Sequence, residues 1–330
     1  MNNRKIFVVW KIYQRRVESL ADELGLDICH YHYKWEERSK FLKAASYPMK
    51  FINTLRDLFR IKPEYVFMQL PPTPVIYAAA IYCRIVSAKY IADCHNAMIY
   101  GANWNRWPLA RRLLRESFLI LVHNNDVEER AKKINLSPFV LRDPLPKMDD
   151  KLDGKFIRQL KLDNQRYIMA PFAFAADEPI DELFNAASML SEITFVMTWF
   201  TERLTAEQER NAPGNILFTG YIEADLYNDL LLHAGAVLAL TNREGTQPSV
   251  ASEAIAARVP LIITKLKTTT MIYGDAPIYV ENTADSIVSG VKYAMQNRAT
   301  SKLKISKYRD KYEEELCHEI NYIKEYMAIN

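Results

Sequence analysis

The 330-residue sequence predicts an α/β protein with two Rossmann-like parallel-sheet domains. Short apolar runs of strand length alternate with longer segments whose apolar residues recur at helical spacing. The runs are continuously apolar, as expected for parallel strands covered on both faces. A proline-stiffened segment at 142–146 and a charged stretch at 147–161 interrupt this alternation, which then resumes. We therefore expect domains at residues 1–148 and 149–300, followed by a charged helical tail at 301–330.

In the first half, apolar runs predict strands and helical spacing predicts the segments between them. The expected strands are 5–10, 27–33, 65–70, 89–92 and 118–123, with a strand end at 140–141. The expected helices are 14–24, 75–86 and 126–134. Between them lies a strongly basic segment, 34–62, in which the residues sharing one helical face are Phe51, Ile52, Leu55, Leu58 and Phe59. Such a helix either packs this face on the sheet or lies on an anionic membrane surface.

The second half repeats the pattern. Its expected strands are 167–170, 193–197, 216–219, 237–240, 261–263 and 279–280. Its expected helices are 179–190, 224–234, 249–257 and 284–297, and helical periodicity continues at 302–326 in the tail.

Composition favours a cytoplasmic globular protein. Hydrophobic residues make up 49% and charged residues 25% of the chain, and no apolar run approaches the roughly 20 residues of a membrane span. The sequence enters its first strand directly, so no secretory signal is expected, and four scattered cysteines fit a reducing compartment. The formal charge is +8 in residues 1–150 and −5 in the rest. This asymmetry predicts an anionic partner for the first half.

The most informative stretch lies at 235–265. A polar loop containing Glu244 and Gly245 follows the strand at 237–240, and a helix with Glu253 one turn inside leads to the next strand. Ser249 is expected to cap that helix with its hydroxyl. The carboxyl ends of parallel strands are where open α/β sheets bind ligands. Helix N–H groups would meet a phosphate there, and the carboxylates would accept from sugar or ribose hydroxyls. A solvated glutamate in a capping loop is the alternative.

This stretch resembles the donor-binding segment of retaining glycosyltransferases with two Rossmann-like domains, the GT-B fold, especially family four. The matching residues are Glu244, Gly245, Pro248, Glu253, Ala254 and Pro260. Eight residues separate the two glutamates where the family has seven, and Arg258 replaces a glycine. The resemblance implies two domains facing each other across a cleft, with Glu253 on the ribose and Glu244 catalytic at the sugar. The donor-binding residues it implies are Gly220, Tyr221, Gly245, Thr246, Gln247, Pro248, Ser249, Val250 and Glu253.

The first half resembles the same family at 93–96, where a strand ends in Asp-Cys-His-Asn. The resemblance implies that His95 is catalytic and lies near the transferred sugar, and a loop-capping histidine is the alternative. Arginines and tryptophans mark an acceptor or membrane side, because arginine binds phosphates and tryptophan prefers the membrane interface. These residues are Arg15, Arg16, Trp104, Arg106, Trp107, Arg111, Arg112 and Arg115. Solvated arginines with core tryptophans are the alternative, and no motif indicates nucleic acid.

We expect no metal and no cofactor beyond the nucleotide-sugar substrate. Cys29 and His30 are neighbours on an expected strand and point to opposite faces, which disfavours a metal site. No Walker loop, dinucleotide glycine motif or paired-cysteine motif is present. The family places an arginine and a lysine after the first strand of the second domain, whereas 170–179 contains no cation here. Arg243, Lys265 and Lys267 are candidate substitutes.

The sequence therefore predicts a hexosyltransferase with an anionic-membrane partner. It would move a sugar from a nucleotide-sugar donor to a glycan or lipid-linked acceptor, with retention, in bacterial-type surface polysaccharide synthesis. Its place would be the cytoplasm, peripheral on the inner face of the plasma membrane. The cation-free loop motivates an alternative: a catalytically inactive scaffold in a membrane glycan assembly complex. A sugar-nucleotide epimerase on the same architecture is a third hypothesis.

Overall fold

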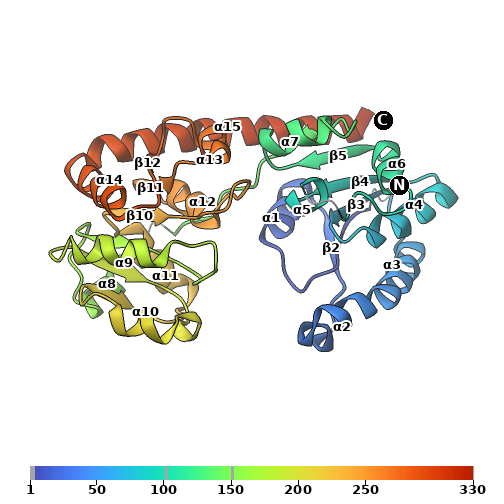
Figure 1. Cartoon of the computed structure of the whole chain (residues 1–330). Helices are drawn as coiled ribbons and strands as arrows, with labels where there is room; N and C mark the ends of the chain where they lie inside the picture. Colours follow the sequence, from blue (N-terminus) through green and yellow to red (C-terminus); the bar gives the residue numbers. More distant parts are fainter. Residues whose placement is uncertain (1–3, 101–102, 150–151, 330) are drawn as a thin grey trace. The chain divides into compact units, whose positions relative to one another are not determined.

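The computed structural model describes residues 4–100, 103–149 and 152–329, and it contains two compact units (Figure 1). Unit 1 holds the residues up to Pro144 together with those from Glu315 onward, and unit 2 is Leu145–Glu314. Each unit contains a six-stranded sheet in which every neighbouring pair is parallel. The predicted pair of Rossmann-like parallel-sheet domains is confirmed, and the cleft between them stays a prediction.

The unit 1 sheet has the strand order β2-β1-β3-β4-β5-β6. Its strands are β1 (Lys5–Val9), β2 (Asp27–His30), β3 (Tyr65–Leu70), β4 (Lys89–Cys94), β5 (Leu119–Val122) and β6 (Phe139–Val140). All six residues of β3 are buried, which explains its unbroken apolar run. The strand expected at 27–33 ends earlier. It lies at the edge of the sheet and pairs with β1, and the last pair is Val9 with His30.

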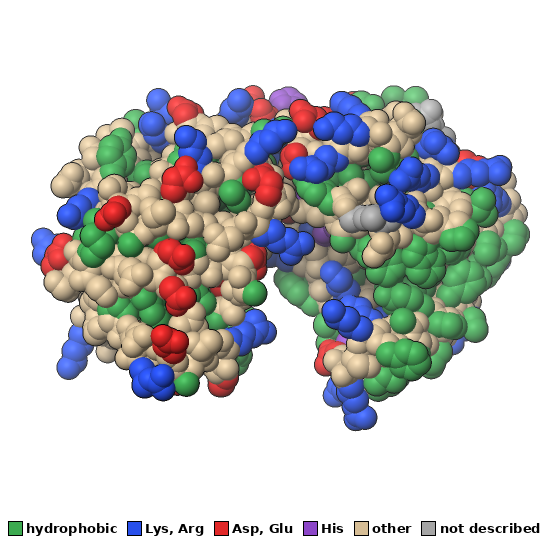
Figure 2. Space-filling view, viewed as in Figure 1, with side chains coloured by type: hydrophobic (Ala, Val, Ile, Leu, Met, Phe, Trp, Pro, Cys, Tyr) green, Lys and Arg blue, Asp and Glu red, His purple; other side chains and the backbone are tan. Residues whose placement is uncertain are grey.

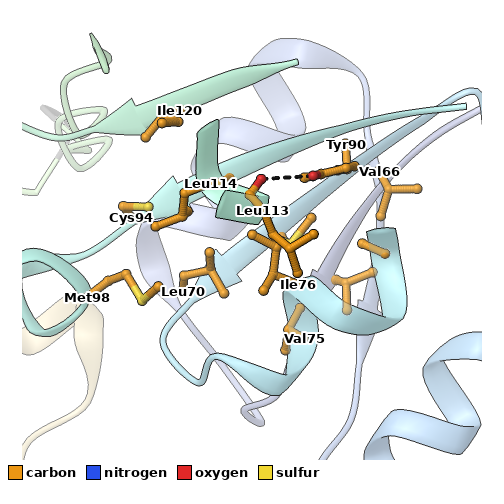
Figure 3. Packing of buried hydrophobic residues seen from close by; sticks show 14 of the residues in the cluster. Val66, Leu70, Val75, Ile76, Tyr90, Cys94, Met98, Leu113, Leu114 and Ile120 are labelled. Carbon is orange, nitrogen blue, oxygen red and sulfur yellow. Dashed lines mark hydrogen bonds between the residues drawn. The ribbon is translucent and has the colours of Figure 1, made fainter. Parts of the chain in front are cut away.

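Helices of unit 1 cover the sheet. They are α1 (Arg15–Leu24), η1 (Lys34–Arg38), α2 (Lys40–Ala45), α3 (Tyr47–Ile61), α4 (Pro74–Val86), α5 (Asn96–Ile99), α6 (Ala110–Glu116) and α7 (Asn125–Lys132). Figure 3 shows part of the core, where Val66 and Leu70 of β3 pack with Val75 and Ile76 of α4. Tyr90 adds a polar tie, because its hydroxyl donates to the Leu113 carbonyl at 2.8 Å.

The face that α3 buries differs from the predicted one. Leu58 is buried as expected, but Ile52 is 64% and Phe59 37% exposed. Polar contacts set this rotation: Lys50 Nζ donates to Glu36 at 2.7 Å, and Thr54 accepts from the Trp10 indole at 3.0 Å. The helix therefore packs on the core and still carries apolar side chains outward.

The unit 2 sheet has the order β12-β11-β10-β7-β8-β9. Its strands are β7 (Tyr167–Met169), β8 (Thr194–Met197), β9 (Ile216–Phe218), β10 (Ala236–Ala239), β11 (Leu261–Thr264) and β12 (Ile278–Val280). Consecutive residues face opposite sides, so Leu238 joins one core cluster and Val237 the other. A Cβ on Gly290 would lie 2.4 Å from Val280 Cγ1, so glycine lets its helix approach the sheet.

Helices of unit 2 include several short ones that the sequence did not predict. The helices are α8 (Lys155–Gln159), α9 (Ile180–Ser188), η2 (Thr201–Arg203), α10 (Ala206–Asn211), α11 (Ala224–Leu232), α12 (Ser249–Ala256), α13 (Lys267–Tyr273) and α14 (Ala284–Gln296). The sequence predicted no helix at α8, η2, α10 or α13. Within the described ranges, no helix is long and apolar enough to cross a membrane.

The tail forms the long helix α15 (Arg298–Ile329), whose two ends belong to different units. Near its start, Ile305 packs in the core of unit 2. Toward its end, Ile320 and Ile323 pack against buried residues of unit 1, and the Tyr65 hydroxyl donates to the Met327 carbonyl at 2.6 Å. The tail is therefore an integral part of the core of unit 1.

Candidate functional site

The carboxyl ends of the unit 2 strands all lie at one edge of the sheet, because the strands are parallel. β10 lies between β11 and β7. The loops at 240–248, 265–266 and 170–179 are therefore neighbours, and they surround the start of α12. This edge is the candidate donor site.

Glu244 lies in the first of these loops and is held by α13. Its carboxylate accepts from the Thr268 amide at 2.8 Å and the Thr268 hydroxyl at 2.7 Å, and the same hydroxyl accepts from the Gly245 amide at 3.1 Å. Gly245 has φ 79, a left-handed conformation that glycine adopts without strain. Desolvation opposes ionisation, but the hydrogen bonds from Thr268 outweigh it and lower the pKa of Glu244. Glu244 is thus an ionised, fixed and solvent-exposed carboxylate.

The start of α12 differs from the prediction that Ser249 caps it. Pro248 occupies the cap position, no side chain caps the helix, and Ser249 is the first helical residue. The ring of Pro248 fixes the backbone at the helix start. The amides of Ser249 and Val250 lie in the first turn, where helix N–H groups have no partner within the helix.

Glu253 lies one turn farther along α12 and is partly exposed. One carboxylate oxygen accepts a hydrogen bond from the hydroxyl of Tyr227 on α11. The contact fixes the carboxylate orientation, and Tyr227 had no place in the sequence-based site. The loop residues before the helix, Thr246 and Gln247, are partly exposed.

The cation-free loop after β7 is closed by one of its own carboxylates. Glu178 accepts from the backbone amides of Ala173 at 3.2 Å and Ala175 at 2.9 Å. Burial raises the pKa of Glu178, while these hydrogen bonds act in the opposite direction. Two backbone amides of this loop are therefore occupied by Glu178. The sequence could show the acidic residue but not its fold back onto the loop.

Cations reach this edge from other elements. Arg243 follows β10, and Lys265 and Lys267 follow β11; all three are exposed and form no ion pair within the described residues. Arg203, which the sequence reasoning missed, donates to the Ala173 carbonyl at 3.1 Å. The loop at 170–179 therefore has cationic side chains in the neighbouring loops on both of its sides.

Gly220 and Tyr221 follow β9, which is separated from β10 by β7 and β8. At about 4.8 Å per strand, they lie at the same edge but roughly 14 Å along it. Gly220 has φ 68. Tyr221 is 57% exposed and stacks on Phe200, with ring centroids 5.5 Å apart and planes 8° apart. Trp199 completes this aromatic group, and its position two residues after β8 was the signal available in the sequence.

In unit 1, a buried polar cluster lies at the carboxyl ends of β3, β4 and β5. Arg16 is 5% exposed; its Nε and Nη2 donate to Asp93 at 3.0 and 2.9 Å, and its Nη1 donates to Asp143. The sequence assigned Arg16 to an acceptor or membrane side; in the structure its guanidinium is enclosed by two carboxylates and is not an exposed cation. Burial alone would raise the pKa of Asp93, but Arg16 outweighs it and holds that pKa far below its usual range. Arg15, the first residue of α1, is partly exposed.

His95 and His123 complete this cluster. His95 Nε2 lies 3.5 Å from Asp93 Oδ2 and 3.3 Å from Gln69 Nε2, and its ring centroid is 6.1 Å from that of His123. Burial lowers the pKa of His123 to about 4, and the charge of Arg16 acts in the same direction, against Asp143. His123 is therefore a neutral imidazole at pH 7. Only His95 was predicted; a polar residue directly after each strand was the signal for His123.

The Trp104–Arg115 segment divides into anchored and exposed residues. Arg111 donates through Nε and Nη2 to the Asn105 side chain at 3.2 and 3.0 Å, and Arg112 pairs with Glu116 at 2.7 Å. Arg111 is thus anchored to Asn105 and partly exposed, and its assignment to an acceptor or membrane side stays a prediction. Arg106 and Arg115 are exposed. Trp104 is partly buried, and Trp107 is 39% exposed and stacks on it.

Across the described residues, no cluster of three or more His, Cys, Asp or Glu side chains is arranged to hold a metal ion. His30 lies 3.1 Å from Glu18, and His32 lies 3.0 Å from Glu37. The two histidines therefore have separate carboxylate partners.

Comparison with solved structures identifies the fold. A glycosyltransferase from Rickettsia africae ESF-5 is 12% identical, with a TM-score of 0.71 over 100% of this chain and 99% of that one. Anabaena HepE, solved in complex with UDP, is 10% identical, with a TM-score of 0.73 over 99% and 100%. Sucrose-phosphate synthase from Thermosynechococcus elongatus is 11% identical, with a TM-score of 0.72 over 99% and 100%. No family model and no curated protein matches the sequence. Over its whole length, this chain has the GT-B fold of two Rossmann-like domains.

Proposed function

We propose that this chain is a glycosyltransferase that moves a hexose from a nucleotide-sugar donor to a glycan or lipid-linked acceptor. The observation that carries the proposal is the edge of unit 2, where two fixed carboxylates, an uncapped helix start and exposed cations occupy neighbouring loops. HepE, with the same fold, is solved with UDP. We further propose a retaining, metal-independent reaction of the family-four type in surface polysaccharide synthesis, on the cytoplasmic side of a membrane.

The two carboxylates have distinct proposed roles. Glu253, partly exposed on α12 and contacted by the Tyr227 hydroxyl, would accept hydrogen bonds from the ribose hydroxyls. Glu244, ionised and anchored by Thr268, would accept from the sugar hydroxyls. The amides at the start of α12 would meet the diphosphate together with Arg243, Lys265 or Lys267. A carboxylate hydrogen bond is worth about 1.5–3 kcal/mol, which is enough to select a hydroxyl-bearing ligand.

We assign the nucleobase to the end of the edge where Gly220 and Tyr221 lie. Phe200 and Tyr221 already stack on each other, with 47% and 57% of their surfaces exposed. Aromatic side chains bind bases through their faces at about 1–3 kcal/mol per base. The backbone around Gly220 would supply the polar contacts of base recognition.

His95 is the proposed catalytic residue of unit 1. Asp93 is fixed by Arg16 and lies 3.5 Å from Nε2 of His95, from which it would accept a hydrogen bond; Nδ1 would then be the acceptor for a sugar hydroxyl. Developing charge on the leaving diphosphate would be met by backbone and side-chain donors. No step in this scheme requires a metal ion.

A turnover assay tests the proposal. Release of nucleoside diphosphate from a panel of nucleotide sugars is measured for the wild type, Glu253→Ala and Glu192→Ala. Glu192 is exposed at the opposite, amino-terminal edge of the sheet, before β8, and serves as the control. We expect kcat/KM to fall about 10- to 150-fold in Glu253→Ala only, as expected for loss of a hydrogen bond to a charged group. Equal turnover in all three proteins would disprove the assignment.

The loop closed by Glu178 favours one alternative, an inactive scaffold in a membrane glycan assembly complex. A carboxylate that occupies the loop amides repels a diphosphate and fills the donors it would use. Detectable turnover of any nucleotide sugar excludes this alternative. If the wild type shows none, Glu178→Gln distinguishes a blocked site from a lost one, because removal of the charge would restore nucleotide binding only to a blocked site.

A further inference from the structure

An apolar pocket opens on unit 1, at the end of the sheet where α4 begins. Its volume is about 670 Å³, within the range of about 300–1,000 Å³ that small-molecule sites occupy. Its walls are Tyr47, Pro48 and Phe51 of α3, Pro74 of α4, Ala44 of α2, and the rings of Trp104 and Trp107. Such a lining fits a hydrocarbon chain.

The tryptophan wall is built into the fold. The Thr73 hydroxyl donates to the Trp104 carbonyl at 2.6 Å, and the Tyr77 hydroxyl donates to the Pro108 carbonyl at 2.6 Å. Asn105, 4% exposed, donates to the Met98 carbonyl at 2.9 Å. These contacts fix the backbone on both sides of the tryptophans, and the two rings stack on each other with centroids 5.8 Å apart.

Cations flank the pocket. Lys40 and Lys43 line it, both are exposed, and neither forms an ion pair within the described part of the chain. Lys50 on α3 differs from these two lysines, because it is buried and forms an ion pair with Glu36. On the other side, Trp107 also lines a hollow of about 580 Å³ together with Arg106 and Arg112.

Apolar side chains continue outside the pocket. Phe41 is 80% and Ile52 64% exposed, and on α4 Ile85 is 66% exposed. Figure 2 shows hydrophobic side chains gathered over α3 and α4, with lysines and arginines around them. An apolar face bordered by cations is the pattern of a surface that lies on an anionic bilayer.

We propose that this pocket holds the hydrocarbon chain of a membrane lipid phosphate, with Lys40 and Lys43 paired to the phosphate. The chain packs between Phe51 and the two tryptophans, and the ammonium groups supply the charge that an apolar pocket lacks. The occupant has the chemistry of a lipid-linked acceptor, and only that identification rests on the proposed function. Binding itself requires no donor and no turnover.

The test uses the full chain and decyl phosphate below its micelle concentration, measured by titration calorimetry. Decanol and inorganic phosphate are the ligand controls, since each supplies half of the chemistry. Ala44→Trp fills the pocket from an exposed helix position, and Lys40→Gln with Lys43→Gln removes its charge. Lys132→Gln with Lys133→Gln, at the end of α7 and outside the pocket lining, removes the same charge from exposed positions and is the charge control.

We expect decyl phosphate to bind the wild type and the α7 control equally, and each pocket variant at least tenfold more weakly. Equal affinity for decanol, equal affinity of the α7 and lysine variants, or unchanged binding by Ala44→Trp would each overturn the proposal. Binding without sugar transfer would leave the pocket standing and remove the proposed function. Sugar transfer without decyl phosphate binding would overturn the pocket proposal and leave the proposed function standing.

Discussion

The Arg16 cluster shows how a charged group is kept inside unit 1. A buried ion costs several kcal/mol of desolvation unless good hydrogen bonds offset it. Arg16 donates to Asp93 through two nitrogens and to Asp143 through a third. The guanidinium of Arg16 therefore fixes both carboxylates, and the Asp93 carboxylate in turn contacts His95.

This cluster predicts a loss of stability below pH 6.5. His123 has a folded pKa of about 4, below the unfolded value of about 6.5, so its contribution is complete above pH 6.5 and is lost as the pH falls toward 4. The difference corresponds to roughly 3 kcal/mol. Asp93 and Asp143 also have lowered pKa values, and their contributions are lost below about pH 4. We expect the Tm to fall between pH 6.5 and 4.5, measured by thermal denaturation.

His123→Gln separates the histidine contribution from general acid denaturation. It should lower the Tm at pH 7 and flatten the fall between pH 6.5 and 4.5. His318→Gln changes an exposed histidine of α15 and should leave the whole profile unchanged. A profile of His123→Gln parallel to that of the wild type would contradict the buried neutral imidazole.

At the scale of elements, the sequence predicts what local patterns determine. The strands from β7 to β12 are continuous apolar runs, and a covered parallel sheet produces that signal directly. The rotation of α3 was not predictable, because it depends on Glu36 and Trp10, which lie in other elements. The two carboxylates of the candidate site were recognisable by spacing. The hydrogen-bond partners of these carboxylates were not recognisable, because Thr268 and Tyr227 lie on other helices and come close to them only in the folded protein.

Helix α15 gives a prediction for unit 1. Ile323 is completely buried in a core cluster of that unit, whereas Ile329, near the end of the helix, is 82% exposed. Ile323→Ala should lower the free energy of unfolding by about 2–5 kcal/mol through lost burial and a residual cavity. Ile329→Ala, the same change at the surface, should have an effect within about 0.5 kcal/mol. Urea denaturation followed by circular dichroism measures both, and equal effects would show that the tail is not part of the core.

At the scale of the whole molecule, charge is divided between the two halves. Residues 1–150 carry a formal charge of +8 and the remainder −5. In unit 1 the basic side chains accompany exposed apolar ones on α3 and α4. The surface that would meet a membrane therefore belongs to one half of the chain.

Vesicle sedimentation tests this surface. The protein should sediment with vesicles rich in phosphatidylserine at low salt, and less with purely zwitterionic vesicles. Raising the salt to 0.5 M should weaken the difference, because screening shortens the range of surface charges. Ile52→Glu, on the exposed face of α3, should reduce binding to both. Equal sedimentation with both vesicle types at low salt would argue against an anionic-membrane partner.

The central claim is that the edge of unit 2 binds a nucleotide-sugar, and a thermal-shift panel tests it most directly. The panel contains uridine, guanosine and adenosine diphosphates with their common sugar conjugates. A ligand at about 100 times its Kd stabilises the fold by about 2.7 kcal/mol, which is a readily measured shift. We predict that one base class shifts the wild type and Glu192→Ala but not Glu253→Ala. No shift with any member of the panel, or the same shift in all three proteins, would contradict the assignment of the donor site.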